Sequence, residues 1–416
     1  MTDTSRIRIN LSAVESNIRV VRDVVGPDPL ICPIVKADAY GLGAAPIARH
    51  LTVAGAGMLA VYTSAQAAAL ARSAVGGPIL VLLPVREMDR IDESYRLLIR
   101  GDLHLTVHDE GHLEDLTRLA EQFATVIPLH LEVDSGMSRG GCSPNKAPTL
   151  ARRISEHRWL RLAGMSTHFA RAATDTRFTD KQLSIFDAVV SKCAPPEDCL
   201  IHAANSVATL RDRRYHKTMV RIGQAWAGFG AERLSEGDFR QQAATLRPIV
   251  TWRSEIVQVR TIQRGTGVGY GSRWTAKRRS RIGLVPVGYA DGYPMGAAAT
   301  NAEPKPACVG VEIDTSGGRE FVRVVGQVNM DQITIDLTDL STPHGRRGAA
   351  VGVGTSVELI GTDPQAPNHV PTLAATAGTV PHHLICSLNP RIKRSYHATE
   401  SYQRAEAVRE QLSAVS

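Results

Sequence analysis

The stretch LHLEVDSGMSRGGCSPNKAPTLARRISEHRWLRLAGMSTH, residues 129–168, decides the fold of this chain. It opens with a short apolar run at 129–133, continues through an amphipathic segment at 145–157 and closes with a second apolar run at 162–167. Short apolar runs are typical of buried strands, whereas apolar residues spaced three to four positions apart are typical of a helix. The stretch therefore predicts a strand–helix–strand unit with two parallel strands.

The same alternation extends from about residue 30 to about residue 230. Eight apolar runs predict strands at 31–35, 58–61, 79–83, 103–106, 129–133, 162–167, 200–202 and 219–222. Helix-like segments separate them, for instance at 44–53, 64–75, 109–123, 145–157 and 180–192. Eight strands alternating with helices predict an α/β fold, a (β/α)8 TIM barrel. A doubly wound open sheet is the alternative, but no GxGxxG motif follows the first strand candidate.

After residue 246 the pattern changes to strands that alternate apolar and polar residues. Such segments lie at 249–260, 282–287, 307–313, 321–328, 333–337 and 356–360. The remaining sequence predicts a short helix at 372–386, a last strand at 391–396 and a polar helix at 400–412. We therefore expect two domains, a barrel over 1–245 and a mostly β C-terminal domain over 246–416. The first strand segment of the chain can belong to the C-terminal domain.

Composition and charge exclude several other classes of protein. Of the 416 residues, 43% are hydrophobic and 21% are charged, which is the ordinary balance of a globular chain. No apolar run approaches the roughly 18 residues that span a bilayer, so we expect no membrane association. The net charge of +7 comes with only 5% aromatic residues, so no nucleic-acid partner is expected. Six scattered cysteines form no zinc-type cluster, which predicts no bound metal and a cytoplasmic location.

The residues that follow the predicted barrel strands could carry chemistry. In a barrel these strand ends converge on one mouth, where active sites lie. The candidates are Lys36 and Tyr40 after the first run, Arg139 after the fifth, His168 after the sixth, Asn205 and Ser206 after the seventh, and Arg221 and Gly223 at the eighth. Each of them alone is a weak signal, because a lysine after a strand is usually a solvated cap and a single histidine is usually a core residue. Together on one rim they predict a site.

A lysine, two arginines, a histidine and a serine–glycine backbone suit a particular cofactor. A lysine can hold pyridoxal 5'-phosphate (PLP) as a Schiff base, and an arginine can meet its pyridine nitrogen or its phenolate oxygen. Barrel phosphate sites commonly lie in the loops after the last two strands, which is where Ser206 and Gly223 fall. The rim therefore predicts a PLP-dependent enzyme.

The chain resembles the alanine racemases over almost its whole length, on several motifs in the same order. VKADAYG at 35–41 is similar to the segment with the cofactor lysine, which implies that Lys36 binds PLP and that Tyr40 contacts its phosphate. VDSGMSR at 133–139 is similar to the segment whose arginine binds the cofactor phenolate and the substrate carboxylate, here Arg139. THFA at 167–170, NS at 205–206 and VRIG at 220–223 imply a supporting His168, phosphate contacts from Asn205, Ser206 and Gly223, and Arg221 opposite the pyridine nitrogen.

Further motifs of this family lie in the predicted second domain. VGYG at 268–271 resembles the segment with a second catalytic base, here Tyr270, and GYADG at 288–292 resembles the substrate passage with Tyr289. NMD at 329–331 resembles the loop whose methionine amide, here that of Met330, binds the substrate carboxylate. The resemblance implies a head-to-tail homodimer in which Tyr270 and Met330 serve the partner subunit's site. It also implies that Lys36 and Tyr270 move the α-proton on opposite faces, which interconverts L-alanine and D-alanine, a peptidoglycan precursor.

Three positions depart from the family pattern. Glu132 stands where many members carry a carbamylated lysine that holds the arginine, so we expect Glu132 to supply this charge to Arg139. Leu42 stands where a histidine is common, and His382 stands where a tyrosine meets the phosphate. These departures keep open a diverged epimerase or aldolase-type PLP enzyme of the same fold that acts on another amino acid.

Other classes agree less well with the motifs. A decarboxylase built on a related barrel is disfavoured by the Tyr270 segment. A single-barrel PLP-binding protein without turnover does not need the C-terminal domain that holds Tyr270 and Met330. A two-domain protein with unrelated rim residues would have to acquire all of the ordered motifs by chance.

Overall fold

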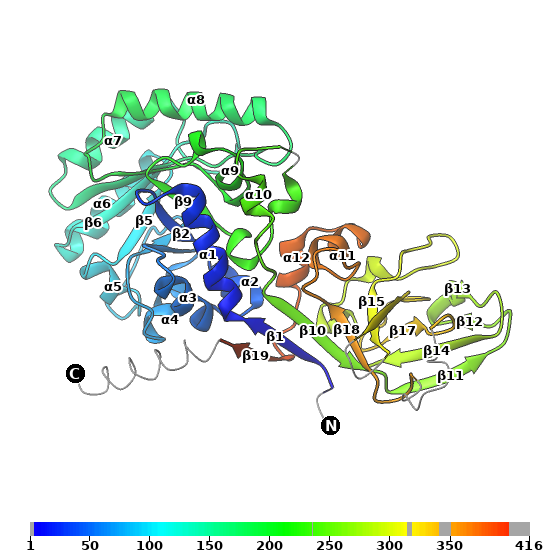
Figure 1. Ribbon diagram of the computed structural model, residues 1–416. Helices are drawn as coiled ribbons and strands as arrows, with labels where there is room; N and C mark the ends of the chain where they lie inside the picture. Colours follow the sequence, from blue (N-terminus) through cyan, green and yellow to red (C-terminus); the bar gives the residue numbers. More distant parts are fainter. Residues whose placement is uncertain (1–3, 235, 314–317, 341–350, 399–416) are drawn as a thin grey trace. The chain divides into compact units, whose positions relative to one another are not determined.

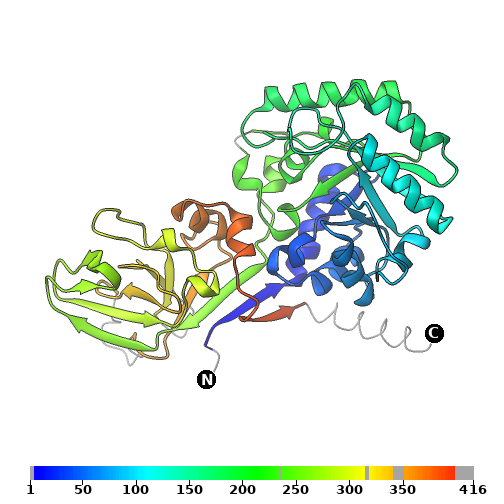
Figure 2. The ribbon, with the colours of Figure 1, turned by 180° about the vertical axis from the view of Figure 1, so that it is seen from behind.

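The computed structural model describes residues 4–234, 236–313, 318–340 and 351–398. The chain divides into two compact units, one over 13–247 and one that combines 1–12 with 248–416 (Figures 1 and 2). The polar helix expected at 400–412 lies outside the described residues.

The unit over 13–247 contains eight parallel strands. They are β2 (Leu30–Pro33), β3 (Leu59–Val61), β4 (Ile79–Val81), β5 (Leu103–Val107), β6 (Ile127–Glu132), β7 (Leu160–Ser166), β8 (Leu200–His202) and β9 (Met219–Ile222). Their order in the sheet is β2-β9-β8-β7-β6-β5-β4-β3. The two end strands meet at a parallel bridge between Ile34 and Ala60, so the sheet is nearly closed into a ring. The predicted barrel is confirmed, and each strand lies at its predicted apolar run.

Helices alternate with these strands and surround them (Figures 1 and 2). The α-helices are α1 (Leu11–Val25), α2 (Lys36–Gly41), α3 (Ala44–Val53), α4 (Ser64–Arg72), α5 (Tyr95–Ile99), α6 (Glu110–Phe123), α7 (Ala147–Glu156), α8 (Thr176–Cys193), α9 (Ser206–Arg211) and α10 (Arg240–Ala243). Single 3-10 turns lie at η1 (Arg213–Tyr215), η2 (Ala225–Ala227) and η3 (Ala231–Arg233). Side chains that accept hydrogen bonds from the first helical turn start several helices, with Thr63 before α4, Asp109 before α6 and Asp175 before α8. Among the described residues, no helix is long and apolar enough to cross a membrane.

The other unit is mostly β. Its strands are β1 (Arg6–Asn10), β10 (Val250–Glu255), β11 (Gln258–Ile262), β12 (Gly267–Val268), β13 (Trp274–Thr275), β14 (Ser280–Val285), β15 (Val309–Glu312), β16 (Arg319–Val322), β17 (Ile333–Asp336), β18 (Ser356–Ile360) and β19 (Lys393–His397). They form a six-stranded sheet in the order β16-β15-β18-β10-β1-β19, a three-stranded sheet β11-β14-β17 and the hairpin β12–β13. The helices are α11 (Val370–Thr376) and α12 (Pro381–Cys386), with 3-10 turns η4 (Tyr270–Ser272), η5 (Tyr289–Asp291) and η6 (Met295–Ala297).

Two elements predicted for this unit are wrong in detail. The segment 249–260 is not one strand, because the chain leaves the six-stranded sheet after β10 and enters the three-stranded sheet with β11. The segment 372–386 is not one helix, because Gly378 has a φ of 70° and Pro381 starts a new helix. The alternation of apolar and polar residues is interrupted at the first break, where residues 253–255 are all polar and residues 256–257 are both apolar.

Candidate active site

The predicted rim residues of the barrel unit follow the carboxyl ends of its strands. Lys36 begins the turn after β2, and its ammonium nitrogen lies 5.8 Å from the centre of the Tyr62 ring. His168 follows β7, Ser206 begins α9 after β8, and Gly223 directly follows β9. The barrel therefore presents these residues at one end, which is where barrel active sites are built.

The turn that follows Lys36 is left-handed. Residues 37–40 have φ between 51° and 59° and ψ between 36° and 51°, although none of them is glycine. This conformation costs on the order of 1–2 kcal/mol per residue for L amino acids. Asp38 offsets part of that cost, because its Oδ1 accepts a hydrogen bond from the Ala44 amide at 2.7 Å. Such strain persists where the surrounding structure holds it, and it is common at functional sites.

Hydroxyl and amide groups gather where the turn meets the end of β9. A Cβ placed on Gly223 would lie 2.4 Å from Tyr40 Oη, so the glycine leaves room for the phenol. The Tyr40 ring stacks on Trp226, with ring centres 5.7 Å apart. Ser206 Oγ accepts hydrogen bonds from the amides of residues 223, 224 and 225 at 2.9, 3.0 and 3.2 Å. The Tyr40 and Ser206 hydroxyls are donors that suit a phosphate group, and the three amides orient the Ser206 hydroxyl.

Asn205 has a structural task in this arrangement. Its side-chain oxygen accepts a hydrogen bond from the Ala208 amide at 3.1 Å and so caps α9. The cap fixes the first turn of α9, which begins with Ser206.

Arg221 is a buried arginine with several acceptors. Its Nη1 lies 2.6 Å from His202 Nδ1, and its Nη2 donates to the Thr167 carbonyl at 2.7 Å. Nη2 also lies 3.3 Å from His168 Nδ1. These contacts hold the guanidinium in one orientation on the barrel rim.

A chain of buried histidines leads from Arg221 into the barrel. His202 Nε2 lies 2.8 Å from His130 Nδ1, and His130 Nε2 lies 2.9 Å from His104 Nδ1. Because a guanidinium only donates hydrogen bonds, His202 must accept at Nδ1 and donate from Nε2, and the same assignment then follows along the chain. Burial lowers the pKa of His130 and His202 well below the usual value, and burial with the charge of Arg161 lowers the pKa of His104 to about 4. The three rings are therefore neutral at pH 7.

The lowered pKa values predict a loss of stability in mild acid. An unfolded histidine binds its proton near pH 6.5, whereas folded His104 does so only near pH 4, so the unfolded state binds more protons between these values. The free energy of unfolding should then fall as the pH falls through this window, by about 1.4 kcal/mol per pH unit for each such histidine. Urea unfolding of the protein at about pH 7 and about pH 5 measures this.

Two histidine variants test this prediction, one inside the row of buried histidines and one outside it. His104→Gln keeps an acceptor for His130 and should make the pH dependence of the unfolding midpoint less steep. His157→Gln, at the end of α7, should leave the pH dependence close to that of the natural protein. Equal pH dependence in all three proteins would contradict the assignment.

The prediction that Glu132 holds Arg139 is wrong in this structure. Glu132 Oε2 lies 3.1 Å from His108 Nδ1, at ion-pair distance but without hydrogen-bond alignment. Burial alone would raise the pKa of Glu132, but the His108 contact and the charge of Arg221 outweigh it and lower the pKa. Arg139 is exposed, and within the described residues no ion pair joins it to Glu132. His108, at the end of the neighbouring strand, therefore lies closer to the Glu132 carboxylate than Arg139, which follows seven positions later in the loop.

Several charges converge on His168. Burial first, and then the charges of Arg221, Arg139 and Lys36, lower the pKa of His168 to about 3. The predicted lysine and both predicted arginines thus act on the same imidazole.

Leu42 is fully buried, which suits its apolar side chain.

The remaining predicted residues belong to the other unit and are described within it. Tyr270 lies at the tip of the β12–β13 hairpin between Gly269 and Gly271, which have φ of 72° and 66°, and the tyrosine is 74% exposed. Tyr289 and Met330 are also exposed for side chains of their kind, at 43% and 54%. His382 is exposed in the first turn of α12.

Comparison with known proteins decides the family. Two family descriptions match, "Alanine racemase, N-terminal domain" over residues 9–230 and "Alanine racemase, C-terminal domain" over residues 249–396. The chain belongs to the alanine racemase family. It is thus an amino-acid racemase, and the resemblance and the enzyme class predicted from the sequence are confirmed.

Individual members of the alanine racemase family match along almost the whole chain. The alanine racemase of Laribacter hongkongensis is 33% identical over 399 residues, covering 95% of this chain and 99% of the relative. That of Halothermothrix orenii is 31% identical over 396 residues, covering 93% and 95%. The solved alanine racemase of Streptomyces lavendulae has a TM-score of 0.80 at 26% identity and covers 97% of this chain and 99% of that one. The solved enzyme of Bartonella henselae, described with covalently bound pyridoxal phosphate, has a TM-score of 0.76 at 26% identity over 95% of this chain and 99% of that one.

Several residues of the barrel site in this alanine racemase family member were not expected from the sequence. His130 lies inside an apolar run and His202 ends one, and their signal was a histidine on each of two strands of one barrel. His108 follows the end of β5, so it met the strand-end criterion that found Lys36. Trp226, whose Nε1 donates to the Ile34 carbonyl at 3.0 Å, gave no such signal.

Proposed function

We propose that this protein interconverts L-alanine and D-alanine with PLP as cofactor. The observation that carries the proposal is the pair of hydroxyls of Tyr40 and Ser206, which meet at Gly223 beside a strand-end lysine, in a barrel of the alanine racemase family. The covalently bound PLP described for the Bartonella henselae enzyme supports the same cofactor here. D-alanine formed in this way would serve peptidoglycan synthesis in the cytoplasm.

The barrel residues divide the work of holding the cofactor. PLP, when bound, withdraws electrons from the α-carbon of an amino acid and so eases loss of the α-proton. Tyr40 and Ser206 would hold the phosphate, Gly223 would leave room for the phenol while its amide orients the Ser206 hydroxyl, and Lys36 would be the residue of covalent attachment. Arg221 would disfavour protonation of the pyridine nitrogen, because two like charges repel each other. His168 supports this arrangement through Arg221.

Two bases carry the proton transfer in this proposal. Lys36 takes or gives the α-proton on one face, and the Tyr270 hydroxyl does so on the other, so that the stereocentre is inverted. Arg139 and the Met330 amide bind the substrate carboxylate, and Tyr289 lines the passage by which the substrate arrives.

A head-to-tail homodimer is part of the proposal. The exposure of Tyr270, Tyr289 and Met330 in a single chain suits residues that act in the site of a second copy. His382 would serve as a phosphate donor in place of a tyrosine. Its imidazole N–H can donate to phosphate.

The test is a racemisation assay on a panel of L-amino acids. We expect loss of optical rotation and incorporation of deuterium at Cα in D2O, fastest with alanine. A faster reaction with another amino acid would assign a different substrate, and exchange without inversion would contradict racemisation.

Gly223 gives a separate test of the phosphate site. Gly223→Ala places a methyl group 2.4 Å from Tyr40 Oη and should push the phenol away, so the PLP concentration for half-saturation should rise by about tenfold or more, the cost of one charge-assisted hydrogen bond. Titration of the PLP-free protein by visible absorbance measures this. Gly76→Ala is the control, since a Cβ there meets nothing within 4 Å. Equal PLP binding by both variants would remove Gly223 from the phosphate site.

A further inference from the structure

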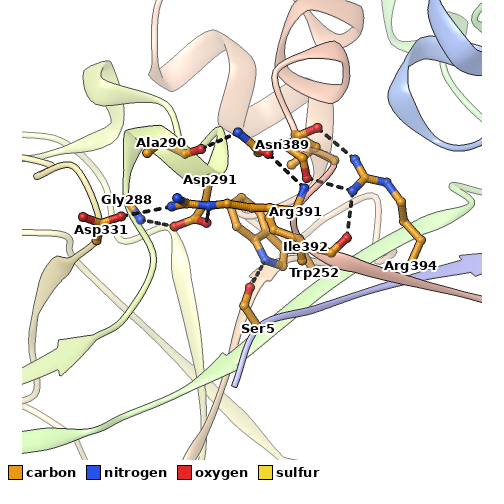
Figure 3. A network of polar contacts seen from close by, with 11 residues as sticks. Ser5, Trp252, Gly288, Ala290, Asp291, Asp331, Asn389, Arg391, Ile392 and Arg394 are labelled. Carbon is orange, nitrogen blue, oxygen red and sulfur yellow. Dashed lines mark hydrogen bonds and ion pairs between the residues drawn. The ribbon is translucent and has the colours of Figure 1, made fainter. Parts of the chain in front are cut away.

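Three segments of the mostly β unit meet around one arginine (Figure 3). They are the turn 288–292, the loop 329–331 and the segment 387–394 after α12. The first carries Tyr289 and the second carries Met330, and the proposed function gives both residues to the substrate. The third carries Arg391, to which neither the sequence motifs nor the proposed function gives a role.

The first two segments are packed backbone to backbone. A Cβ on Gly288 would lie 2.2 Å from the Met330 carbonyl oxygen and 2.3 Å from that of Asn329, so only glycine fits there. The Tyr289 amide donates to the Asn329 carbonyl and the Ala290 amide to the Met330 carbonyl, both at 3.0 Å. A shift of either segment therefore moves the other.

Arg391 bridges carboxylates from both segments (Figure 3). Its Nε donates to Asp291 Oδ1 at 2.9 Å, and its Nη2 donates to Asp331 Oδ1 at 3.0 Å. The other oxygen of Asp291 accepts the Gly288 amide at 3.0 Å, so this buried carboxylate is occupied on both sides. The two carboxylates raise the pKa of Arg391, which keeps the guanidinium charged.

The backbone of the third segment is itself fixed to the turn. The Asn389 amide donates to the Asp291 carbonyl at 3.0 Å, and the Asn389 side chain donates to the Ala290 carbonyl at 2.9 Å. Asn389 Oδ1 also accepts the Arg391 amide at 2.9 Å. Arg391 thus starts from a fixed position, and its planar guanidinium can hold two carboxylates at a set spacing.

We propose that Arg391 is a positioning residue for the substrate, which holds the segments of Tyr289 and Met330 in one register through Asp291 and Asp331. The inference rests on the proposed function, which places these two residues at the substrate. Arg391 and Asp331 are 50% and 62% exposed, and such pairs contribute little to the free energy of unfolding. The consequence of the bridge is therefore expected in substrate binding rather than in stability.

The test compares KM with kcat in variants of the full-length protein. Arg391→Met should raise KM for both alanine enantiomers by about tenfold and change kcat less than about threefold, because it loosens groups that bind the substrate but not the bases. Arg391→Lys keeps a charge but not the two-pronged bridge, so it should restore KM only in part. Asp331→Asn should raise KM in the same direction, and the double variant with Arg391→Met should add little.

A readout that needs no turnover accompanies these measurements. Hydrogen exchange of the Tyr289 and Ala290 amides should be faster in Arg391→Met, and the visible spectrum of the PLP-loaded protein should not change. Arg260→Met, at an exposed arginine of β11, is the matched control and should leave both KM and exchange near their natural values. Unchanged KM and unchanged exchange in Arg391→Met, or a fall in kcat alone, would overturn the inference. If the natural protein racemises no amino acid, the proposed function fails, whereas the exchange experiment still decides whether Arg391 holds the two segments.

Discussion

Replacing Lys36 with alanine is expected to abolish racemisation and to remove the visible absorption band of the purified protein. The variant loses both the amine that attaches PLP and one of the two bases, so we expect activity to fall by about 10⁴-fold or more. Lys36 is placed for both roles, because it begins the left-handed turn that brings Tyr40 to Gly223. Optical rotation of alanine solutions and a visible spectrum measure the two effects.

A second lysine variant is the control, and chemical trapping of the cofactor gives the result that could contradict the assignment. Lys181→Ala, on the exposed surface of α8, should keep the activity and the absorption band. Borohydride reduction followed by peptide mass spectrometry should find the cofactor on the peptide with Lys36. Finding it on another lysine would contradict the assignment.

Replacing Tyr270 with phenylalanine should affect the two faces of the substrate differently. Racemisation needs both bases and should fall by about 10²–10⁴-fold in both directions. Exchange of the α-proton with solvent should persist for the one enantiomer whose proton Lys36 takes, and it should be lost for the other. Because Tyr270 is exposed on the β12–β13 hairpin, removing its hydroxyl should leave the fold intact, and the thermal midpoint checks this.

Proton magnetic resonance in D2O follows exchange of each enantiomer separately. Tyr95→Phe, in α5, is the control, since the Tyr95 ring packs against Phe123 of α6 and its variant should leave both exchanges unchanged. Equal loss of exchange from both enantiomers in Tyr270→Phe would contradict a division of labour between two bases.

The barrel could be predicted because most residues of its strands are buried, with β8, of which only His202 is fully buried, as the exception. Such strands are continuous apolar runs, and the ends of β8 and β9 are those that the sequence indicates. The helix α1 was missed, although Val14, Ile18, Val21 and Val25 are buried at helical spacing. That helix directly follows a strand of the other unit, so the alternation of the barrel does not extend to it.

The site could be predicted only where the type of residue and its place on a strand end coincide. Lys36, His168 and Ser206 satisfy both conditions, whereas Tyr270 and Met330 rest on motifs in family order and stay predictions. The partner of Glu132 could not be predicted, because His108 lies on a neighbouring strand end and their proximity depends on the register of β5 and β6. The left-handed turn after Lys36 could not be predicted either, since residues 37–40 contain no glycine.

The strand β1 has a consequence for how the protein is made. It lies between β10 and β19, pairing Ile7 with Trp252 and Arg6 with Lys393, so its partners leave the ribosome only after the whole barrel has been synthesised. Ordering contacts this far apart in sequence is slow, because a long loop must close before the pairing can stabilise it. During synthesis β1 therefore stays unpaired while the barrel can already fold. Until the last strand arrives, the nascent chain carries open sheet edges, which is the stage at which a growing polypeptide depends most on protection from aggregation.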